Sequence, residues 1–281
     1  MKKFSGLALK TLLGVAASAV IVGHASAADL AAPEPIVEAV VPSMWDVAFG
    51  VAGVTDYRFR GVSQSNQNPA VQGYFEVQAF DWIYAGVWGS SVDFPERRSL
   101  TDPAMEVDFY AGIRHTWDAF TIDAGGIYYY YPGEHKAFPG QKQIDYWEIY
   151  AKPSYSFGDF GSITGNIFWT SDFVNLGNDA LYLSAIPKVN IPLASFPDLA
   201  FYVSGEIGKQ WFKKSSLADP VDYLTWNVGA GVTYKAMTLD VRYSDTDLKK
   251  SECYTNTAAR SWCGDAIVAK LSFDTAFSKL K

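Results

Sequence analysis

The chain has 281 residues, of which 19% are charged and 16% aromatic, and its formal net charge at pH 7 is -7. An acidic chain argues against nucleic acid as a partner, because phosphate binding needs clustered Lys and Arg side chains. Beyond the N-terminal segment, no apolar run reaches the roughly 20 residues of a membrane-spanning helix. An aromatic-rich chain of low charge without such runs has the composition of an outer-membrane β-barrel.

The N-terminal residues have the pattern of an export signal. A basic start precedes a mostly apolar stretch, residues 7–22, and a small-residue cleavage pattern, residues 25–27. Lys10 interrupts the apolar stretch, which leaves it too short for a membrane anchor. We therefore expect residues 1–27 to be a cleaved signal peptide and residues 28–43 to be an extended, proline-containing periplasmic lead-in. Removal of three lysines and no acid would change the formal charge from -7 to -10.

Twelve segments of alternating apolar and polar residues follow. Side chains of a strand point alternately to its two faces, so a membrane strand has one apolar face and one polar or small face. Residues 223–234 show this most clearly, with Leu224, Trp226 and Val228 on one face. The expected strands are residues 45–56, 70–80, 83–94, 104–117, 120–131, 144–157, 162–173, 180–191, 199–211, 223–234, 237–245 and 265–273.

The connections between these segments alternate strictly between short and long. Short turns and longer loops on opposite rims are typical of outer-membrane barrels, whereas a soluble sandwich has no reason to sort its loops in this way. Aromatic residues gather at both ends of the segments, as expected for two membrane interfaces. The patterns predict an all-β fold over residues 44–281: a transmembrane antiparallel up-and-down β-barrel of about 12 strands, with short periplasmic turns and longer extracellular loops. The last strand either ends at Phe273 or continues further.

Charged residues on the polar faces are expected to point into the barrel, because a lipid-facing Arg or Lys at mid-bilayer costs about 2–4 kcal/mol. They either line an aqueous path or pair across the interior and plug it. A barrel of about eight strands is filled by its side chains and one of about sixteen holds a channel, so twelve strands leave both possibilities open. The candidate lumen-lining residues are Glu76, Glu106, Asp108, Arg114, Asp123, Glu148, Lys152, Arg242 and Lys270.

Signs of an enzyme or a metal site are sparse. The chain contains no G-x-S-x-G motif, and only His115 and His135 remain after the signal peptide. His135 lies in a long loop, where a serine and an acid could join it in a lipid-modifying enzyme; this is the least favoured hypothesis. We predict no catalytic residue, no cofactor and no metal site.

The two cysteines, Cys253 and Cys263, lie close together near the C-terminus. In an oxidising compartment they are expected to form a disulfide that closes one loop. A zinc site at these cysteines would be a more specific hypothesis. Zinc requires about four ligands, however, and the nearest histidine in sequence is His135. The disulfide is therefore the better hypothesis.

The first long connection opens with a dense motif. Its residues Asp56-Tyr57, Phe59-Arg60-Gly61 and Ser63-Gln64-Ser65 resemble the N-terminal signature of the TorF family of outer-membrane porin-like proteins from proteobacteria. The resemblance implies an outer-membrane barrel with a role in passive transport, but no substrate and no catalytic residue. Its two arginines are expected at the mouth of the barrel, where they either gate ions or form a structural clasp. The rim motif comprises Asp56, Tyr57, Arg58, Phe59, Arg60, Gly61, Ser63, Gln64 and Ser65.

Together the patterns predict a porin-like channel in the outer membrane of a Gram-negative bacterium, passing small polar solutes or ions by diffusion. The alternative is a closed barrel with a structural or surface role through its long loops. The expected partners are outer-membrane lipid, the permeating solutes and, during biogenesis, the outer-membrane assembly machinery. The patterns specify no oligomeric state.

Overall fold

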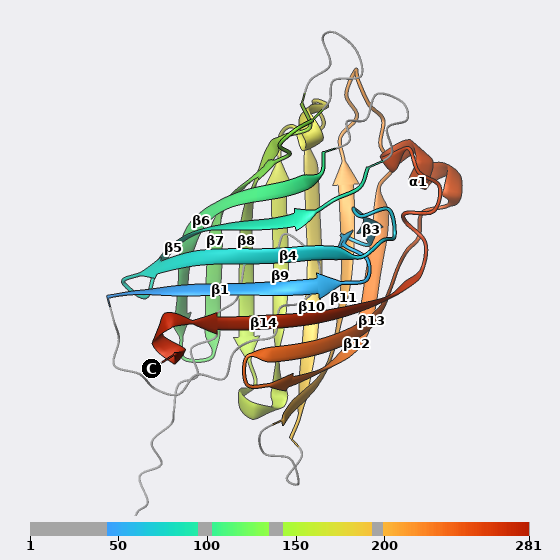
Figure 1. Cartoon of the computed structure of the whole chain (residues 1–281). Helices are drawn as coiled ribbons and strands as arrows, with labels where there is room; N and C mark the ends of the chain where they lie inside the picture. The colour runs from blue at the N-terminus through green and yellow to red at the C-terminus, as the bar shows by residue number, and fades with distance from the viewer. Residues whose placement is uncertain (1–43, 95–102, 135–142, 193–198, 281) are drawn as a thin grey trace, which may run out of the picture.

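The computed structural model of the chain describes residues 44–94, 103–134, 143–192 and 199–280. Within these residues, twelve antiparallel strands pair edge to edge and close into a barrel (Figure 1). The barrel strands are β1 (Trp45–Val54), β4 (Ala70–Ala79), β5 (Ile83–Ser91), β6 (Met105–Trp117), β7 (Phe120–Tyr130), β8 (Tyr146–Ser156), β9 (Gly161–Thr170), β10 (Ala180–Ile191), β11 (Leu199–Phe212), β12 (Tyr223–Tyr234), β13 (Met237–Thr246) and β14 (Ala266–Ala276).

The barrel closes where its first strand meets its last. β1 pairs with β14 in a register that runs from Ala48 opposite Ala276 to Val54 opposite Lys270. The opposite edge of β1 pairs with β4. Closure leaves no free sheet edge, as a membrane sheet requires, because unpaired backbone groups cannot be hydrated inside a bilayer.

The structure confirms the predicted fold class and corrects some strand ends. The expected segments 180–191 and 223–234 coincide with β10 and β12. The expected end of the last strand at Phe273 is wrong, because β14 continues to Ala276 in order to pair with β1. A short 3₁₀ turn, η4 (Phe277–Lys279), follows it.

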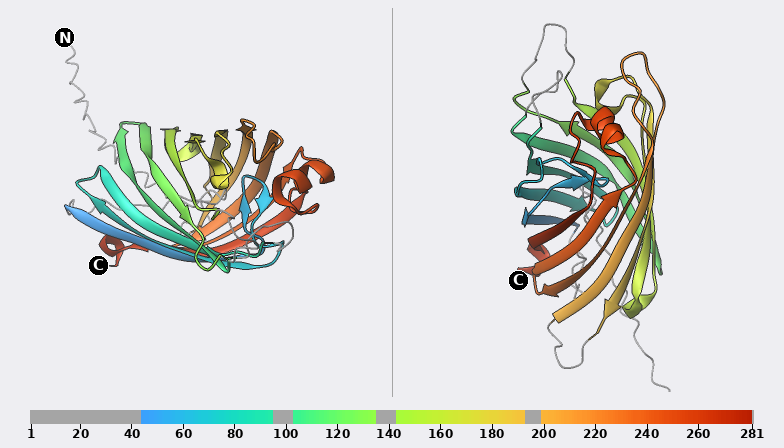
Figure 2. Two further views of the ribbon diagram at one scale, coloured as in Figure 1. Left: turned by 90° about the horizontal axis from the view of Figure 1, so that it is seen from above. Right: turned by 90° about the vertical axis from the view of Figure 1, so that its right-hand side faces the viewer.

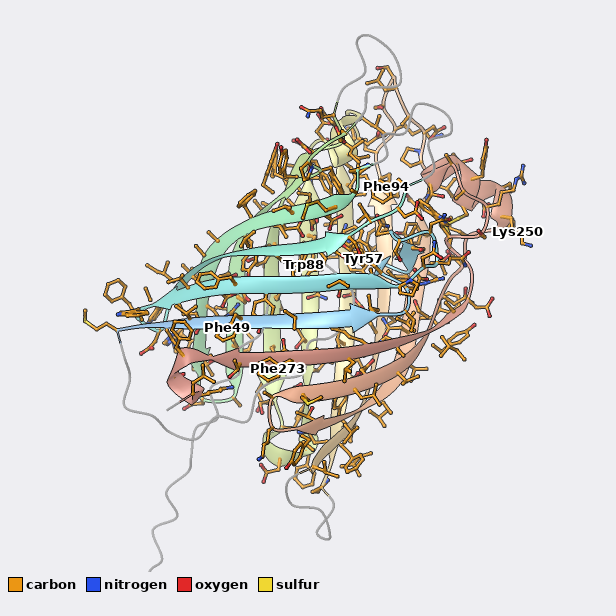
Figure 3. All side chains as sticks on the ribbon, in the orientation of Figure 1. Phe49, Tyr57, Trp88, Phe94, Lys250 and Phe273 are labelled. Atoms are coloured by element: carbon orange, nitrogen blue, oxygen red, sulfur yellow. A yellow bond between two sulfur atoms is a disulfide. The ribbon has the colours of Figure 1, made fainter. Side chains whose placement is uncertain are left out.

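The outer surface of the barrel is apolar. Large apolar side chains on the outward face of successive strands are exposed, whereas the alternate positions on the same strands are mostly buried. Val51 of β1, Ile207 of β11 and Ile267 of β14 are 62%, 60% and 74% exposed. An apolar surface that runs around the whole barrel would be unfavourable in water, and it matches a lipid environment instead. Figure 3 shows side chains projecting from the strands, with Phe49 on β1 and Phe273 on the neighbouring β14.

The connections are sorted by length, as predicted. The turns after β4, β6 and β12 have only a few residues, and Asp81, Asp118 and Lys235 adopt positive φ there. Two short 3₁₀ turns, η2 (Gly158–Phe160) and η3 (Phe173–Asn175), precede and follow β9. The long connection after β13 carries the helix α1 (Lys250–Thr257). No helix among the described residues is long and apolar enough to cross a membrane.

Candidate functional site

Residues 56–65 form a small hairpin that lies inside the barrel, and we call it the lumen hairpin. Its two short strands, β2 (Arg58–Phe59) and β3 (Val62–Ser63), pair with each other and not with the barrel wall. Figure 2 shows the hairpin within the ring of strands, near α1. The sequence suggested that this motif lies on the rim of the barrel. The structure instead places it inside the barrel.

The tip of the lumen hairpin is a two-residue turn, Arg60-Gly61, in which both residues have positive φ, 51° and 81°. This is the geometry of a type I′ turn, which favours Asn, Asp or Gly at both positions. An arginine held in the left-handed region costs on the order of 1–3 kcal/mol. Gly61 is required for a second reason: a Cβ there would lie 2.3 Å from Thr225 Oγ1 and 2.7 Å from Thr246 Cγ2.

Asp56 holds the two sides of the hairpin together. Its carboxylate accepts hydrogen bonds from Ser63 Oγ at 2.6 Å, Ser65 Oγ at 3.2 Å and Arg58 Nε at 2.8 Å. The Ser65 hydroxyl also accepts a bond from the backbone N–H of Tyr57. The spacing of acid, arginine and serines in the motif is therefore that of a self-contained hydrogen-bonded hairpin.

The guanidinium of Arg60 reaches a buried socket in the wall. It donates to Glu148 through two bonds, Nη2–Oε2 at 2.7 Å and Nη1–Oε1 at 3.1 Å, and to Gln210 Oε1 at 2.8 Å. The rings of Tyr182 and Phe168 lie 4.5 and 5.0 Å from its Cζ. Burial lowers the pKa of Arg60, but the charge and hydrogen bond of Glu148 together with Tyr129 and Tyr146 outweigh it, so the pKa is raised and the side chain stays charged.

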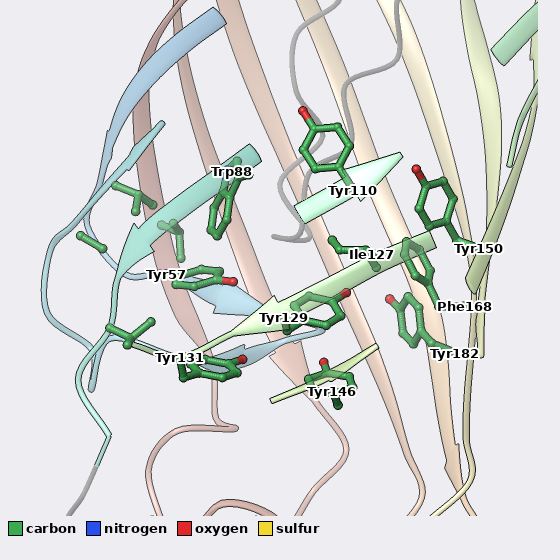
Figure 4. Packing of buried hydrophobic residues seen from close by; sticks show 14 of the residues in the cluster. Tyr57, Trp88, Tyr110, Ile127, Tyr129, Tyr131, Tyr146, Tyr150, Phe168 and Tyr182 are labelled. Atoms are coloured by element: carbon green, nitrogen blue, oxygen red, sulfur yellow. The ribbon is translucent and has the colours of Figure 1, made fainter. Parts of the chain in front are cut away.

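Tyr57 makes the second contact between the hairpin and the wall. Its hydroxyl donates to Glu106 Oε1 at 2.7 Å, and its ring packs edge-on against Trp88 with centroids 5.5 Å apart (Figure 4). The side chain is completely buried. Burial, together with the charges of Glu106 and Asp108, raises the pKa of Tyr57 well above its usual range. The phenol therefore remains protonated and acts as a hydrogen-bond donor.

The lumen hairpin is also tied to the long loop after β13. Arg58 Nη1 donates to the carbonyl of Gly264 at 2.6 Å, and the backbone N–H of Ser63 donates to the carbonyl of Trp262 at 3.0 Å. Cys253 and Cys263 form the expected disulfide within this loop. Two segments that are far apart in sequence thus form one assembly at the long-loop end of the barrel.

Glu106, Asp108 and Glu148 are three predicted lumen residues that the structure brings close to the hairpin. Each is almost fully buried, and the charges of Glu106 and Glu148 act on Asp108. Neither carboxylate oxygen of Asp108 has a hydrogen-bond partner among the described residues. This part of the interior is therefore richer in carboxylates than in cations.

Arg114 is the centre of a second buried network. It contacts Glu76 Oε1 through Nη1 at 3.2 Å and Asp123 Oδ2 through Nε at 3.0 Å, and its Cζ lies 4.2 Å from the centroid of the Tyr84 ring. The hydroxyl of Tyr84 is hydrogen-bonded to Asp123 and to the hydroxyl of Tyr150. Arg114 thus pairs with two of the predicted acids inside the barrel.

Of the remaining predicted cations, Arg242 and Lys270 lie beside Asp240, and Lys152 lies beside the Arg114 network, opposite Asp123 in the register of β7 and β8. Arg242 binds Asp240 through Nε and Nη2, at 2.8 and 2.9 Å. Lys270 faces Asp240 in the register of β13 and β14. The ammonium of Lys152 lies 4.5 Å from the centroid of the Tyr150 ring.

Sequence reasoning did not single out the residues that complete the Arg60 socket. Gln210, Tyr182 and Phe168 project inward from three neighbouring strands, and Tyr129 donates to Glu148 Oε2 at 2.9 Å. Their inward position follows from strand alternation, but their convergence on one arginine does not. Figure 4 shows the rings of Tyr129, Phe168 and Tyr182 inside the barrel.

The two histidines beyond the N-terminal segment are not brought together by the described part of the structure. The ring of His115 stacks on Trp82 with centroids 3.8 Å apart. His135 lies outside the described residues. Among the described residues, no group of three or more His, Cys, Asp or Glu side chains is placed to hold a metal ion.

Comparisons with known proteins identify a family. A family model described as "Bacterial protein of unknown function (Gcw_chp)" matches residues 38–274. This match does not show the expected TorF membership. No curated protein sequence matches the chain.

Three solved structures illustrate the similarity in fold. LpxR from Salmonella typhimurium is 10% identical, with a TM-score of 0.41 over 80% of this chain and 99% of that chain. An outer membrane channel from Pseudomonas putida F1 is 11% identical, with a TM-score of 0.44 over 85% and 97%. OmpT, an outer membrane protein of Vibrio cholerae, is 10% identical, with a TM-score of 0.36 over 85% and 100%.

Proposed function

We propose that this chain, which belongs to the Gcw_chp family of bacterial proteins of unknown function, is an outer-membrane channel for small polar solutes or ions that the lumen hairpin closes. It crosses the outer membrane of a Gram-negative bacterium with its short turns in the periplasm. The proposal includes a cleaved signal at residues 1–27 and a lead-in at residues 28–43, both outside the described residues. We do not assign it an enzymatic activity.

The membrane location is supported by the apolar outer face. Exposed Val, Leu, Ile and Phe side chains recur on strand after strand, while most charged residues of the same strands point inward; Lys209 and Asp245, near the long-loop end, lie on the outer face. Aromatic side chains such as Trp117 and Phe160 are exposed near the short turns, and Trp147 and Trp169 near the long loops. These two groups correspond to the aromatic girdles of an outer-membrane barrel.

The channel function is supported chiefly by one observation: the contacts that close the lumen come from a loop, the lumen hairpin. Many polar side chains of the wall pair with partners on the adjacent strand, such as Thr116 with Thr121 and Thr233 with Thr238. The contacts of Arg60 with Glu148 and Gln210, by contrast, come from a hairpin with its own internal hydrogen bonds. A hairpin of this kind can leave the lumen without breaking the barrel.

The second candidate is the closed barrel that acts through its long loops. It is favoured by the depth of the Arg60–Glu148 pair, because breaking a buried ion pair costs about 3–5 kcal/mol. A permanently seated hairpin would block diffusion. The lipid-modifying hypothesis depends on His135, which lies outside the described residues, and its test is lipid turnover by the His135→Ala variant.

Recordings in planar lipid bilayers separate the two main candidates. We expect the wild-type protein to show small or infrequent conductance steps and Arg60→Ala to show larger or more frequent ones. Lys214→Ala is the matched control, because Lys214 pairs with Asp219 on the exposed surface. A folded Arg60→Ala protein that never conducts would contradict the channel and favour the closed barrel.

A further inference from the structure

The geometry points to a binding site for a guanidinium-bearing cation inside the barrel: we propose that Arg60 occupies this site as a tethered ligand and that a guanidinium solute displaces it. The site consists of Glu148, Gln210, Tyr182 and Phe168, and we call it the guanidinium socket. The inference rests on the proposed channel function and names the class of solute that the channel recognises.

The guanidinium socket belongs to the barrel wall. Glu148 lies on β8, Phe168 on β9, Tyr182 on β10 and Gln210 on β11, four consecutive strands. Tyr182 faces Phe168 directly in the register of β9 and β10. The lumen hairpin contributes the ligand and one ring, Phe59, whose centroid lies 4.5 Å from the Arg60 Cζ, so the four wall residues remain in place when the hairpin leaves.

The acceptors of the guanidinium socket are oriented by other groups. Tyr129 Oη donates to Glu148 Oε2 at 2.9 Å. The amide nitrogen of Gln210 donates to the carbonyls of Leu181 and Trp211 at 3.1 and 3.3 Å, which directs its oxygen toward Arg60. The site is therefore preorganised, and a ligand that enters it does not have to order these side chains.

The shape of the socket selects a guanidinium over an ammonium. Two parallel N–H groups meet the two oxygens of Glu148, and a further bond goes to Gln210. A planar fork satisfies this arrangement, whereas an ammonium acts as a point charge. The Tyr182 and Phe168 rings, at 4.5 and 5.0 Å from the Arg60 Cζ, add cation–π contacts with a delocalised cation.

Buried carboxylates beside the socket provide a second, independent indication. Asp108 is fully buried, the charges of Glu106 and Glu148 act on it, and its oxygens have no hydrogen-bond partner in the described part of the chain. When Arg60 leaves, the uncompensated negative charge increases. A cation that enters the lumen is therefore attracted to this point, and an anion is repelled.

The backbone conformation at the hairpin tip favours the replacement of Arg60 by a free guanidinium solute. Arg60 has a φ of 51°, a conformation that L residues rarely adopt, in a turn that prefers Asn or Gly. A free guanidinium cation makes the same contacts without this strain. The tethered arginine is thus a ligand that a solute of the same chemistry can replace.

The first test is chemical rescue of the full-length Arg60→Ala protein folded in detergent micelles. We expect methylguanidine to raise its Tm, and methylammonium, a cation of the same charge, to leave it unchanged. The double variant Arg60→Ala/Glu148→Gln should show no rise with either cation. If Arg60→Ala folds poorly, the same comparison is made on its refolding yield. No effect of methylguanidine, or equal effects of both cations, would overturn the site.

The second test measures permeation and separates the site from the channel. In planar bilayers we expect Arg60→Ala to pass methylguanidinium more readily than methylammonium, and we expect methylguanidine to increase the current through the wild-type protein. A conducting variant without this preference overturns the inference and leaves the channel standing. Rescue of Tm without any conductance supports the guanidinium socket and overturns the channel.

Discussion

Arg60 and Glu148 form a two-point ion pair inside the barrel, with Nη2–Oε2 at 2.7 Å and Nη1–Oε1 at 3.1 Å, although 88 residues separate them in sequence. Both side chains are at most 2% exposed. The pair connects the tip of the lumen hairpin to β8. The pair holds the hairpin inside the barrel together with the bonds of Tyr57 to Glu106 and of Arg58 to Gly264.

Glu148→Gln should release the lumen hairpin. The change keeps the shape of the side chain but leaves the Arg60 guanidinium buried without a counter-charge, which costs about 3–5 kcal/mol. Trypsin, which cleaves after lysine and arginine, should cut the variant at Arg58 or Arg60 while the wild-type hairpin is protected by burial. Asp219→Ala removes its exposed pair with Lys214, worth about 0–1 kcal/mol, without removing a trypsin site, and should leave the hairpin as resistant as in the wild type. Equal resistance of wild type and Glu148→Gln would contradict the prediction.

Gly61→Ala should displace the hairpin by a steric route. The added Cβ would meet Thr225 and Thr246 at less than 3 Å, and φ at this position is 81°. We expect a lower Tm and faster cleavage by trypsin. Gly53→Ala is the control, because a Cβ on Gly53 meets nothing within 4 Å. If both variants behave like wild type, Gly61 is not a packing constraint on the hairpin.

Replacing both Cys253 and Cys263 by Ser should loosen the long loop after β13 but leave the barrel folded. The disulfide closes a loop between positions 10 residues apart, and loops of about this size contribute roughly 3 kcal/mol. Trp262 Nε1 donates to Asn66 Oδ1 at 3.0 Å, so loosening the loop also weakens the anchor of the hairpin. The measurement is tryptophan fluorescence together with the gel mobility of the unheated barrel. Loss of the folded band would show that the disulfide is needed for the barrel itself.

Asp46→Ala should weaken the closure of the barrel. The carboxylate of Asp46 accepts bonds from the backbone N–H and the hydroxyl of Ser278, which fastens η4 beside β1. The ring of Phe277 packs against Phe49 at 5.6 Å in the same place. Loss of these bonds should cost about 1–3 kcal/mol and lower the folded fraction after refolding into micelles. Asp159→Ala is the matched control, since Asp159 lies in the exposed turn η2.

The positions of the barrel strands could be predicted from the sequence because they depend on local patterns of residues. Alternation of side chains depends only on neighbouring residues, and the bilayer requires the same outward polarity of every strand. The predicted segments 180–191 and 223–234 therefore coincide with β10 and β12. The inward direction of Glu148 and Arg114 follows from the same alternation.

The end of β14 and the position of the motif depend on distant partners. β14 extends to Ala276 because β1 lies beside it, and no pattern within 265–281 contains that information. The bond between Arg58 and Gly264 joins residues 206 positions apart. A polar connection of ordinary loop composition could equally have covered the rim, so its composition could not reveal that it enters the barrel.

The sequence by itself determined the strands, their two faces and the sorting of the loops, because strands and faces follow from the two-residue period of side chains and the sorting from the lengths of the connections. It also contained the motif that became the lumen hairpin. Only the tertiary structure decided where that motif lies, since closure of the barrel brings Glu148, Gln210 and Tyr182 around one point. Arg60 fills that point and supplies the counter-charge of the buried Glu148 carboxylate.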